Sequence, residues 1–325
     1  MTTPADRIAD ALGRCRHVLL LNHVSPDGDC LGSTLALARA LSTRGQRATV
    51  GSADGVPEVY RFLPGADGIR RELPDDAAYD AVVFMECSTP DRAGALAARA
   101  AAVPLWVNID HHLNNGGFGH LIAYDATAAA VAELVHPIVR RLAPGPDRQT
   151  ATCLLCALLT DTGSFRYPAV TQRTLTIAAD LVGQGAHPSE VYARVYENRP
   201  ATTLRLLGQA LGRLRLSPDG RVAWTVVTQA MLGETGAAME ESEGIVGALR
   251  AIAGVDVAML FKEDPDGIRV SLRARGAVSA NAIAEAFGGG GHAAAAGFTG
   301  RGTLDEVVRQ TLEVVERELR TAAAS

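Results

Sequence analysis

Three mainly apolar runs in the first third of the chain constrain its fold most strongly. They cover residues 17–22, 79–85 and 104–109. Apolar runs without polar alternation are typical of parallel strands buried on both faces. Between and after them come patterns that predict helices, at residues 31–41, 126–142, 150–159 and 172–182. We therefore expect an α/β fold whose N-terminal part is a doubly wound, mainly parallel sheet.

Acidic and histidine residues follow each of these runs. In chain order they are His23 with Asp27 and Asp29, then Glu86, then Asp110 with His111 and His112. In an open parallel sheet, ligands bind beyond the carboxyl ends of the strands, so these side chains should converge. Asp161 follows an apolar helix that ends near Gly163, and we expect it at the same place.

The residue types at this edge favour a metal site. Carboxylate oxygens and imidazole nitrogens suit manganese, magnesium or a similar ion better than a thiolate-type zinc site. The alternative for Asp29 is a capping role at the start of the next helix. A histidine doublet after an aspartate, together with carboxylates at other element ends, is poorly explained by packing, so we prefer the metal.

Four motifs carry a family resemblance. HVSPDGD, ECSTPDR, IDHH and LLTDTGSF resemble, in order, the metal motifs of the DHH phosphoesterase family, and residues 270–275 and 287–298 resemble its DHH-associated substrate domain. At this length the chain is similar to the bacterial nanoRNase and phosphoadenosine-phosphate phosphatase branch. The resemblance also implies a homodimer.

The resemblance implies a role for each motif residue. His23, Asp27 and Glu86 would hold one divalent ion, and Asp29, Glu86, His111 and Asp161 the other. Asp110 would orient its neighbours, and His112 would face the scissile phosphate or the bridging water. We expect two Mn²⁺ ions, with Mg²⁺ or Co²⁺ as alternatives.

One position departs from the family pattern. The family carries aspartate where this chain has Glu86. The longer side chain can still bridge two ions if the strand end or the metal spacing adjusts. Asp91 is the alternative ligand, but it lies in the loop beyond a proline, so we prefer Glu86.

A second group of residues predicts substrate binding. Residues 288–291 are glycines, and glycine weakens a helix or strand by roughly 0.5–1 kcal/mol relative to alanine, so close backbone approach to a phosphate or nucleotide explains them better. A flexible hinge is the alternative. The guanidinium group of an arginine can donate two hydrogen bonds to one phosphate, which favours a substrate-binding role. For Arg269 and Arg275, the alternative is an ordinary solvated strand face. The expected substrate contacts are Ser271, Arg273, Gly289, Gly290, Gly291 and His292.

The pattern along the chain predicts two domains. Residues 1–186 form the metal-binding catalytic domain, residues 187–203 a helical linker, and residues 204–325 a smaller α/β substrate domain. In the last of these we expect strands at residues 221–228, 255–263 and 268–275, and a closing helix at residues 304–319. The substrate would be held between the two lobes.

Composition limits the function further. The net charge of −5 disfavours a general nucleic-acid binder and favours a short oligonucleotide or a nucleotide. Lys262 is the sole lysine and no GxxxxGK[ST] motif occurs, which excludes a P-loop enzyme. Five cysteines without a secretory pattern predict a reducing cytoplasm, and no apolar stretch predicts a membrane span. Cys153 and Cys156 should be buried packing residues.

These observations predict a metal-dependent phosphoesterase. Its expected substrates are short RNA or DNA oligonucleotides, the 3′-phosphate of adenosine 3′,5′-bisphosphate, or both. The alternatives are a phosphodiesterase for cyclic-dinucleotide products, a pyrophosphatase or polyphosphatase, and a non-catalytic nucleotide sensor. The glycine-rich segment argues against an inorganic substrate, which needs dense lysine and arginine.

Overall fold

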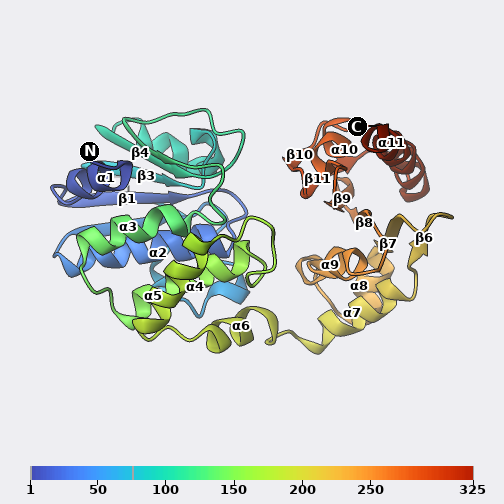
Figure 1. Ribbon diagram of the computed structural model, residues 1–325, viewed down its shortest axis with the longest axis horizontal. Coiled ribbons are helices and arrows are strands. Elements are labelled where there is room, and N and C mark those ends of the chain that lie inside the picture. Colours follow the sequence, from blue (N-terminus) through green and yellow to red (C-terminus); the bar gives the residue numbers. More distant parts are fainter. Residues whose placement is uncertain (1, 75–76, 325) are drawn as a thin grey trace. The chain divides into compact units, whose positions relative to one another are not determined.

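The chain folds into two compact units, Met1–Asn198 and Arg199–Ser325, each with its own sheet (Figure 1). A computed structural model describes residues 2–74 and 77–324. Because each unit also has its own hydrophobic core, we describe them separately.

The sheet of the first unit is entirely parallel, as the apolar runs predict. Its strands are β1 (His17–Asn22), β2 (Arg47–Gly51), β3 (Ala81–Met85), β4 (Leu105–Asp110) and β5 (Leu121–Tyr124). They are arranged in the order β2-β1-β3-β4-β5, and every neighbouring pair is parallel. The chain first adds β2 on one side of β1 and then crosses to the other side of β1 to form β3, β4 and β5, so the direction in which strands are added reverses between β1 and β3. In folds of this kind, such a switch point is where ligands bind.

Helices and 3₁₀ segments cover the two faces of this sheet. The α-helices are α1 (Pro4–Leu12), α2 (Gly28–Thr43), α3 (Ala132–Leu142), α4 (Arg148–Asp161), α5 (Gln172–Gly183) and α6 (Pro188–Tyr196); the 3₁₀ segments are η1 (Glu58–Tyr60), η2 (Ala66–Gly68) and η3 (Pro90–Ala100). Val18 and Leu20 pack into the core that residues of α1 to α4 share, whereas Leu19 and Leu21 pack with residues of η3. Both faces of β1 are therefore buried.

Two glycines allow α2 and α4 to pack closely. A β-carbon at Gly28 would meet the Thr160 side chain at 2.6 Å, and one at Gly32 would meet the Cys153 carbonyl oxygen at 2.3 Å. Gly28 lies at the start of α2 and Thr160 near the end of α4, so the helices run in opposite directions. This contact brings the start of α2, with Asp29, to the end of α4, with Asp161. Cys153 and Cys156 are buried in α4, as predicted.

The second unit is built on a mixed sheet. Its strands are β6 (Arg215–Leu216), β7 (Val222–Val227), β8 (Val257–Asp264), β9 (Gly267–Ala274), β10 (Gly290–His292) and β11 (Ala295–Gly300), in the order β10-β11-β9-β8-β7-β6. Only the β7–β8 pair is parallel among these described strands. The helical segments are α7 (Ala201–Leu211), α8 (Gln229–Thr235), η4 (Met239–Ser242), α9 (Ile245–Arg250), α10 (Ala280–Glu285) and α11 (Leu304–Ala324). The α/β fold predicted for both parts of the chain is confirmed.

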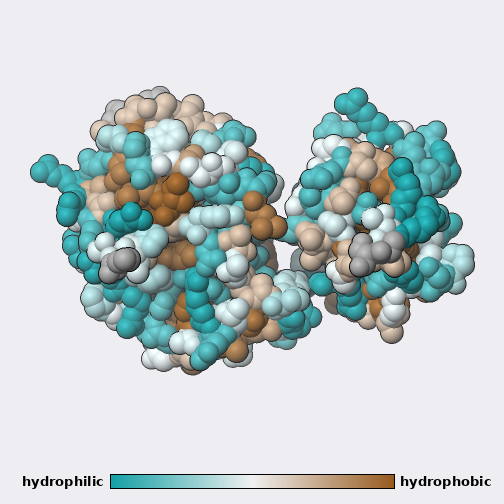
Figure 2. Space-filling model, turned by 45° about the horizontal axis from the view of Figure 1, so that its top comes forward, coloured by the Kyte–Doolittle hydropathy of each residue, from teal (hydrophilic) through white to brown (hydrophobic). Residues whose placement is uncertain are grey.

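On the face drawn in Figure 2, hydrophobic residues gather in patches that hydrophilic residues interrupt. No helix in residues 2–74 and 77–324 is long and apolar enough to cross a bilayer.

Candidate metal centre

Six of the predicted site residues meet at the carboxyl edge of the first sheet. His23 directly follows β1, Glu86 directly follows β3, and His111 and His112 follow β4. Asp29 lies in the first turn of α2, and Asp161 is the last residue of α4. Their ligand atoms form two overlapping groups in which all atoms lie within 4.8 Å of one another: Glu86, His111 and His112, and Asp29, His111 and Asp161. His23 and Glu86 belong to a third such group.

Backbone carbonyls orient two of the histidines. His23 Nδ1 lies 2.7 Å from the Val24 carbonyl oxygen, and His111 Nδ1 lies 3.0 Å from that of Ala128. A carbonyl only accepts, so Nδ1 carries the proton in the neutral ring and Nε2 keeps its lone pair. His111 Nε2 lies 3.6 Å from Glu86 Oε1 and 3.5 Å from Asp161 Oδ2. Both rings are thus arranged as metal-binding histidines are.

Glu86 lies between these two histidines. Its side chain is only 2% exposed, and Oε2 lies 3.9 Å from His23 Nε2. Among the described residues, Oε2 has no hydrogen-bond partner. The backbone of Glu86 has φ = 57°, a left-handed conformation that is rare for residues other than glycine and is concentrated at functional sites. A buried carboxylate oxygen without a partner is costly, and a bound cation would satisfy it.

Asp29 connects the cluster to the start of α3. Its Oδ1 accepts hydrogen bonds from the Ala132 amide at 3.0 Å and from the Ser33 hydroxyl at 3.1 Å, and its Oδ2 accepts one from the Val131 amide. These amides belong to Val131, the residue before α3, and to Ala132, where α3 begins rather than at 126 as predicted. Asp29 therefore caps the start of α3, whereas the N-cap of α2 is Asp27.

Asp110 holds His112 in one orientation. Asp110 is fully buried, and its Oδ1 lies 2.7 Å from His112 Nδ1 and accepts the backbone amides of His111 and His112. Asn115 donates to Oδ2 at 2.6 Å. Burial opposes ionisation of Asp110, but these hydrogen bonds outweigh it and lower its pKa. A carboxylate beside Nδ1 fixes the proton on that nitrogen, which leaves the lone pair of the neutral His112 ring on Nε2.

Without a cation, the electrostatics of this cluster favour bound protons. Burial raises the pKa of Glu86 and Asp29 well above the ordinary carboxyl range, and neighbouring carboxylates raise it further. Burial also raises the pKa of Asp161 to about 6. Burial lowers the pKa of His111, but Glu86 and two aspartates outweigh it and raise that pKa to about 11. Crowded carboxylates are stabilised by divalent cations, so the donor set fits metal ions.

Two acidic residues considered from the sequence lie outside these groups. Asp27 is exposed and caps α2, with Oδ1 accepting the Cys30 amide at 3.0 Å. Its charge still acts on His23 and Glu86. Asp91 is exposed in η3, and none of the groups found among the described residues contains it.

Sequence reasoning missed two side chains at this site. Cys30 lies within 4.8 Å of ligand atoms of both His23 and Glu86, and Asn115 contacts Asp110. The position of Cys30, next to Asp29 in the first helical turn, was an available signal. For Asn115, the turn after the histidine doublet gives no pattern that identifies its partner.

The predicted substrate residues lie in the second unit, at its β9–β11–β10 edge. Arg273 pairs with Ala295 of β11, which in turn pairs with His292 of β10. Directly paired residues in antiparallel strands share a face, so Arg273 and His292 are on the same face, two strands apart. A β-carbon at Gly289 would meet the Gly297 carbonyl oxygen at 2.3 Å, and one at Gly291 would meet that of Ala295 at 2.6 Å. Close strand packing therefore requires these glycines.

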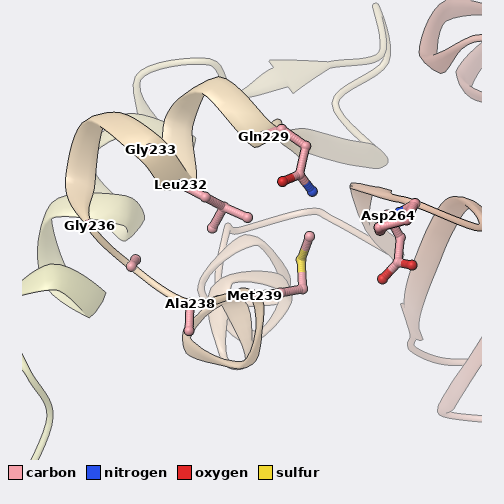
Figure 3. Close-up of a pocket in the computed structure, with 9 residues that line it drawn as sticks. Gln229, Leu232, Gly233, Gly236, Ala238, Met239 and Asp264 are labelled. Atoms are coloured by element: carbon pink, nitrogen blue, oxygen red, sulfur yellow. The ribbon is translucent and has the colours of Figure 1, made fainter.

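A separate hollow of about 590 Å³ lies between α8, η4 and the β8–β9 turn (Figure 3). Leu232 and Met239 extend toward it, with Gln229 and Asp264 at its rim. Its described lining contains none of the predicted metal or substrate residues. It is therefore distinct from the histidine and carboxylate cluster.

Comparison with known proteins decides the family. The model of the "DHH family, N-terminal domain" matches residues 17–158, and that of the "DHHA1 domain" matches residues 220–321. A relative from Thermus thermophilus is 36% identical over 94% of this chain and 91% of its own length. The chain belongs to the DHH phosphoesterase family. Proteins of this family are metal-dependent hydrolases of phosphoester bonds.

Other relatives also match this chain over most of its length. The Thermus relative and one from Bacillus subtilis are both named bifunctional oligoribonuclease and PAP phosphatase NrnA. The Bacillus protein is 28% identical over 86% of this chain and 88% of its own length. A solved structure from Bacteroides fragilis, described as an exopolyphosphatase-related protein, has a TM-score of 0.92 and 26% identity, and the match covers 98% of this chain and 97% of that one.

Proposed function

We propose that this chain is a divalent-metal-dependent phosphoesterase that hydrolyses short oligonucleotides and removes the 3′-phosphate of adenosine 3′,5′-bisphosphate. The observation that carries the proposal is the position of Glu86, whose two oxygens lie 3.6 and 3.9 Å from Nε2 of His111 and His23. The names of the Thermus and Bacillus relatives support both substrates.

Two cations are proposed to bind at this cluster. His23, Asp27 and Glu86 would hold one, and Asp29, Glu86, His111 and Asp161 the other. Mn²⁺ fits carboxylate and imidazole donors, as do Mg²⁺ and Co²⁺. When bound, such ions acidify water and neutralise charge that develops on a phosphate.

The protein's own groups perform the remaining steps. Asp110 stays ionised and keeps the Nδ1 proton of His112 in place, so His112 exchanges a proton with the substrate through Nε2. Arg273, Ser271 and His292, with the amides of Gly289, Gly290 and Gly291, are proposed to bind the phosphates and the nucleotide. An arginine fork suits that task.

An inorganic substrate is the second candidate, since the Bacteroides fragilis structure is described as exopolyphosphatase-related. The test compares hydrolysis of a 5′-phosphorylated dinucleotide, adenosine 3′,5′-bisphosphate, pyrophosphate and polyphosphate in the presence of Mn²⁺. We expect turnover of the first two. Turnover of inorganic phosphates alone would favour the second candidate, and turnover of none would favour a nucleotide sensor.

A further inference from the structure

A thiol lies among the proposed metal ligands. Cys30 is fully buried in the first turn of α2. Its Sγ, a ring nitrogen of His23 and a carboxylate oxygen of Glu86 all lie within 4.8 Å of one another. These residues come from the start of α2, the end of β1 and the end of β3, so the switch point of the sheet itself brings the thiol to this position.

A buried carboxylate oxygen of Glu86, without a hydrogen-bond partner in the described part of the chain, lies beside His23. Glu86 Oε2 lies 3.9 Å from His23 Nε2 and has no hydrogen-bond partner among residues 2–74 and 77–324. The other nitrogen of His23 is already bonded to the Val24 carbonyl. A nitrogen lone pair, a carboxylate oxygen and a sulfur thus surround one position. A buried oxygen of this kind requires a partner, and a cation is one.

We propose that Cys30 is a further metal ligand and that, with His23 and Glu86, it forms a nitrogen, sulfur and oxygen site for thiophilic divalent ions such as Zn²⁺ and Cd²⁺. This rests on the proposed function only in that both place a divalent ion at this cluster. Thiolate ligands favour softer ions, whereas carboxylate and imidazole alone favour Mn²⁺ or Mg²⁺. On binding, the thiol proton is released to solvent and a metal–sulfur bond forms.

The spacing of His23 and Glu86 is close to that of two ligands in a zinc site. Zinc binds sulfur, nitrogen and oxygen at about 2.0–2.3 Å in a tetrahedron, which puts its donors roughly 3.3–3.8 Å apart. The distance from His23 Nε2 to Glu86 Oε2 is 3.9 Å, close to that range. Three protein ligands leave a fourth position open, as in catalytic zinc sites.

This arrangement places thiophilic ions in competition with the catalytic ion. Zn²⁺ at Cys30 would take up His23 and one oxygen of Glu86, which the proposed phosphoesterase needs for Mn²⁺. The other Glu86 oxygen faces His111. Cys30 therefore determines which ions occupy one half of the centre.

The structure supplies a matched control. Cys30 and Cys87 are both fully buried, and both thiols donate to the Met85 carbonyl, at 3.5 and 3.4 Å. None of the metal-binding groups found among the described residues includes Cys87. If Cys30 were only a packing residue with a carbonyl partner, the two cysteines would behave alike.

The test is a Cd²⁺ titration of the full-length, metal-free protein, followed by ultraviolet absorption. A sulfur-to-cadmium charge-transfer band appears only when a thiolate binds the ion. We expect the band at one equivalent in the wild type and in Cys87→Ala, and its loss in Cys30→Ala and Cys30→Ser. No band in the wild type at full occupancy, or a band that persists in a folded Cys30 variant, overturns the proposal.

A competition measurement gives the selectivity. Cys30→Ala should lower Zn²⁺ affinity at least about tenfold more than Mn²⁺ affinity, a typical loss for a metal-site group. An unchanged ratio of the two affinities would contradict the proposal. Turnover of a dinucleotide with Mn²⁺ is measured separately, so a cadmium band without turnover refutes the proposed function alone, and turnover without the band refutes the role of Cys30 alone.

Discussion

Glu86 Oε1 lies 3.6 Å from His111 Nε2, although the two residues follow different strands. β3 pairs with β4 so that Met85 lies beside Ile109, and the Glu86 amide donates to the Ile109 carbonyl at 2.8 Å. The sheet register therefore brings both side chains to one edge. Because its other oxygen lies 3.9 Å from His23 Nε2, Glu86 connects the two histidines of the cluster.

Glu86→Gln should lose at least one of the bound ions, because a neutral amide bridges two cations poorly. Glu86→Asp should keep both ions and measurable turnover. Metal content after gel filtration, determined by elemental analysis, distinguishes the two variants. Asp91→Asn is the control and should retain the wild-type content. Loss of metal in Asp91→Asn, with none in Glu86→Gln, would move the ligand into η3.

His111→Ala should reduce turnover at least about 100-fold, in line with the effect of disturbing a metal site. The fold should persist, since the strands behind the site supply the buried core. His136→Ala is the matched control, because His136 bonds Asp180 at 2.8 Å outside the cluster. Steady-state kinetics and circular dichroism check both variants. Activity of His111→Ala within about tenfold of wild type, equivalent to ~1.4 kcal/mol, would refute the assignment.

Two substitutions of Asp29 should distinguish its role in metal binding from its role in stability. Asp29→Asn and Asp29→Ala should both weaken metal binding, but only alanine removes every acceptor for the Val131 and Ala132 amides. Unpaired buried amides cost about 1–3 kcal/mol, so the alanine variant should be less stable than the asparagine variant by that amount. Urea unfolding of the metal-free variants measures the difference. Equal stability would argue against a capping role.

Metal affinity should rise with pH. In the metal-free protein the pKa of Asp161 is raised to about 6 and that of His111 to about 11, so a cation must displace protons from both at lower pH. Each displaced proton changes affinity by roughly tenfold per pH unit, and Mn²⁺ binding should weaken most steeply below about pH 6. Isothermal titration calorimetry in buffers of different ionisation enthalpy counts the protons. Affinity independent of pH would contradict this description.

The same pKa shifts predict the stability of the metal-free protein. A carboxyl whose pKa is raised on folding contributes stability at pH below its unfolded pKa, and this contribution is lost as the pH rises through the folded value. For Asp161 that window runs from the ordinary 3.8 to about 6. Saturating Mn²⁺ should reverse the trend, which thermal unfolding with and without the ion can measure.

Arg273→Ala and His292→Ala should weaken substrate binding while leaving metal content unchanged, because both residues belong to the second unit. The loss of a charge-assisted phosphate contact costs on the order of 1.5–3 kcal/mol. Arg269→Ala, on the same strand, is the control and should have a much smaller effect. Michaelis constants for a dinucleotide provide the measurement. Reduced metal occupancy in either variant would contradict the separation of roles.

The fold was largely predictable because buried strands have a strong signature. β1, β3 and β4 are mainly apolar and well buried, and the polar residues at and after their ends mark the carboxyl edge. The strands β2 and β5 were missed, since edge strands are short and only partly buried, so their pattern is weak. β10 was missed because glycines carry no side-chain pattern.

The sequence predicted which residues belong to the site better than it predicted the contacts that these residues make. The positions of His23, Glu86 and His111 follow from strand ends and sheet topology. The capping of α3 by Asp29 and the bond between Asn115 and Asp110 depend on loops distant in sequence, which no local pattern encodes. Cys30 resembles an ordinary core cysteine until the position of Glu86 is known.

The most direct test of the central claim follows release of mononucleotide from a 5′-phosphorylated dinucleotide by the purified protein. We predict no turnover after chelation of divalent ions, recovery when Mn²⁺ is added back to the wild type, and no recovery in His111→Ala. Turnover that survives chelation, or equal recovery in His111→Ala, would contradict a metal-dependent phosphoesterase centred on Glu86 and His111.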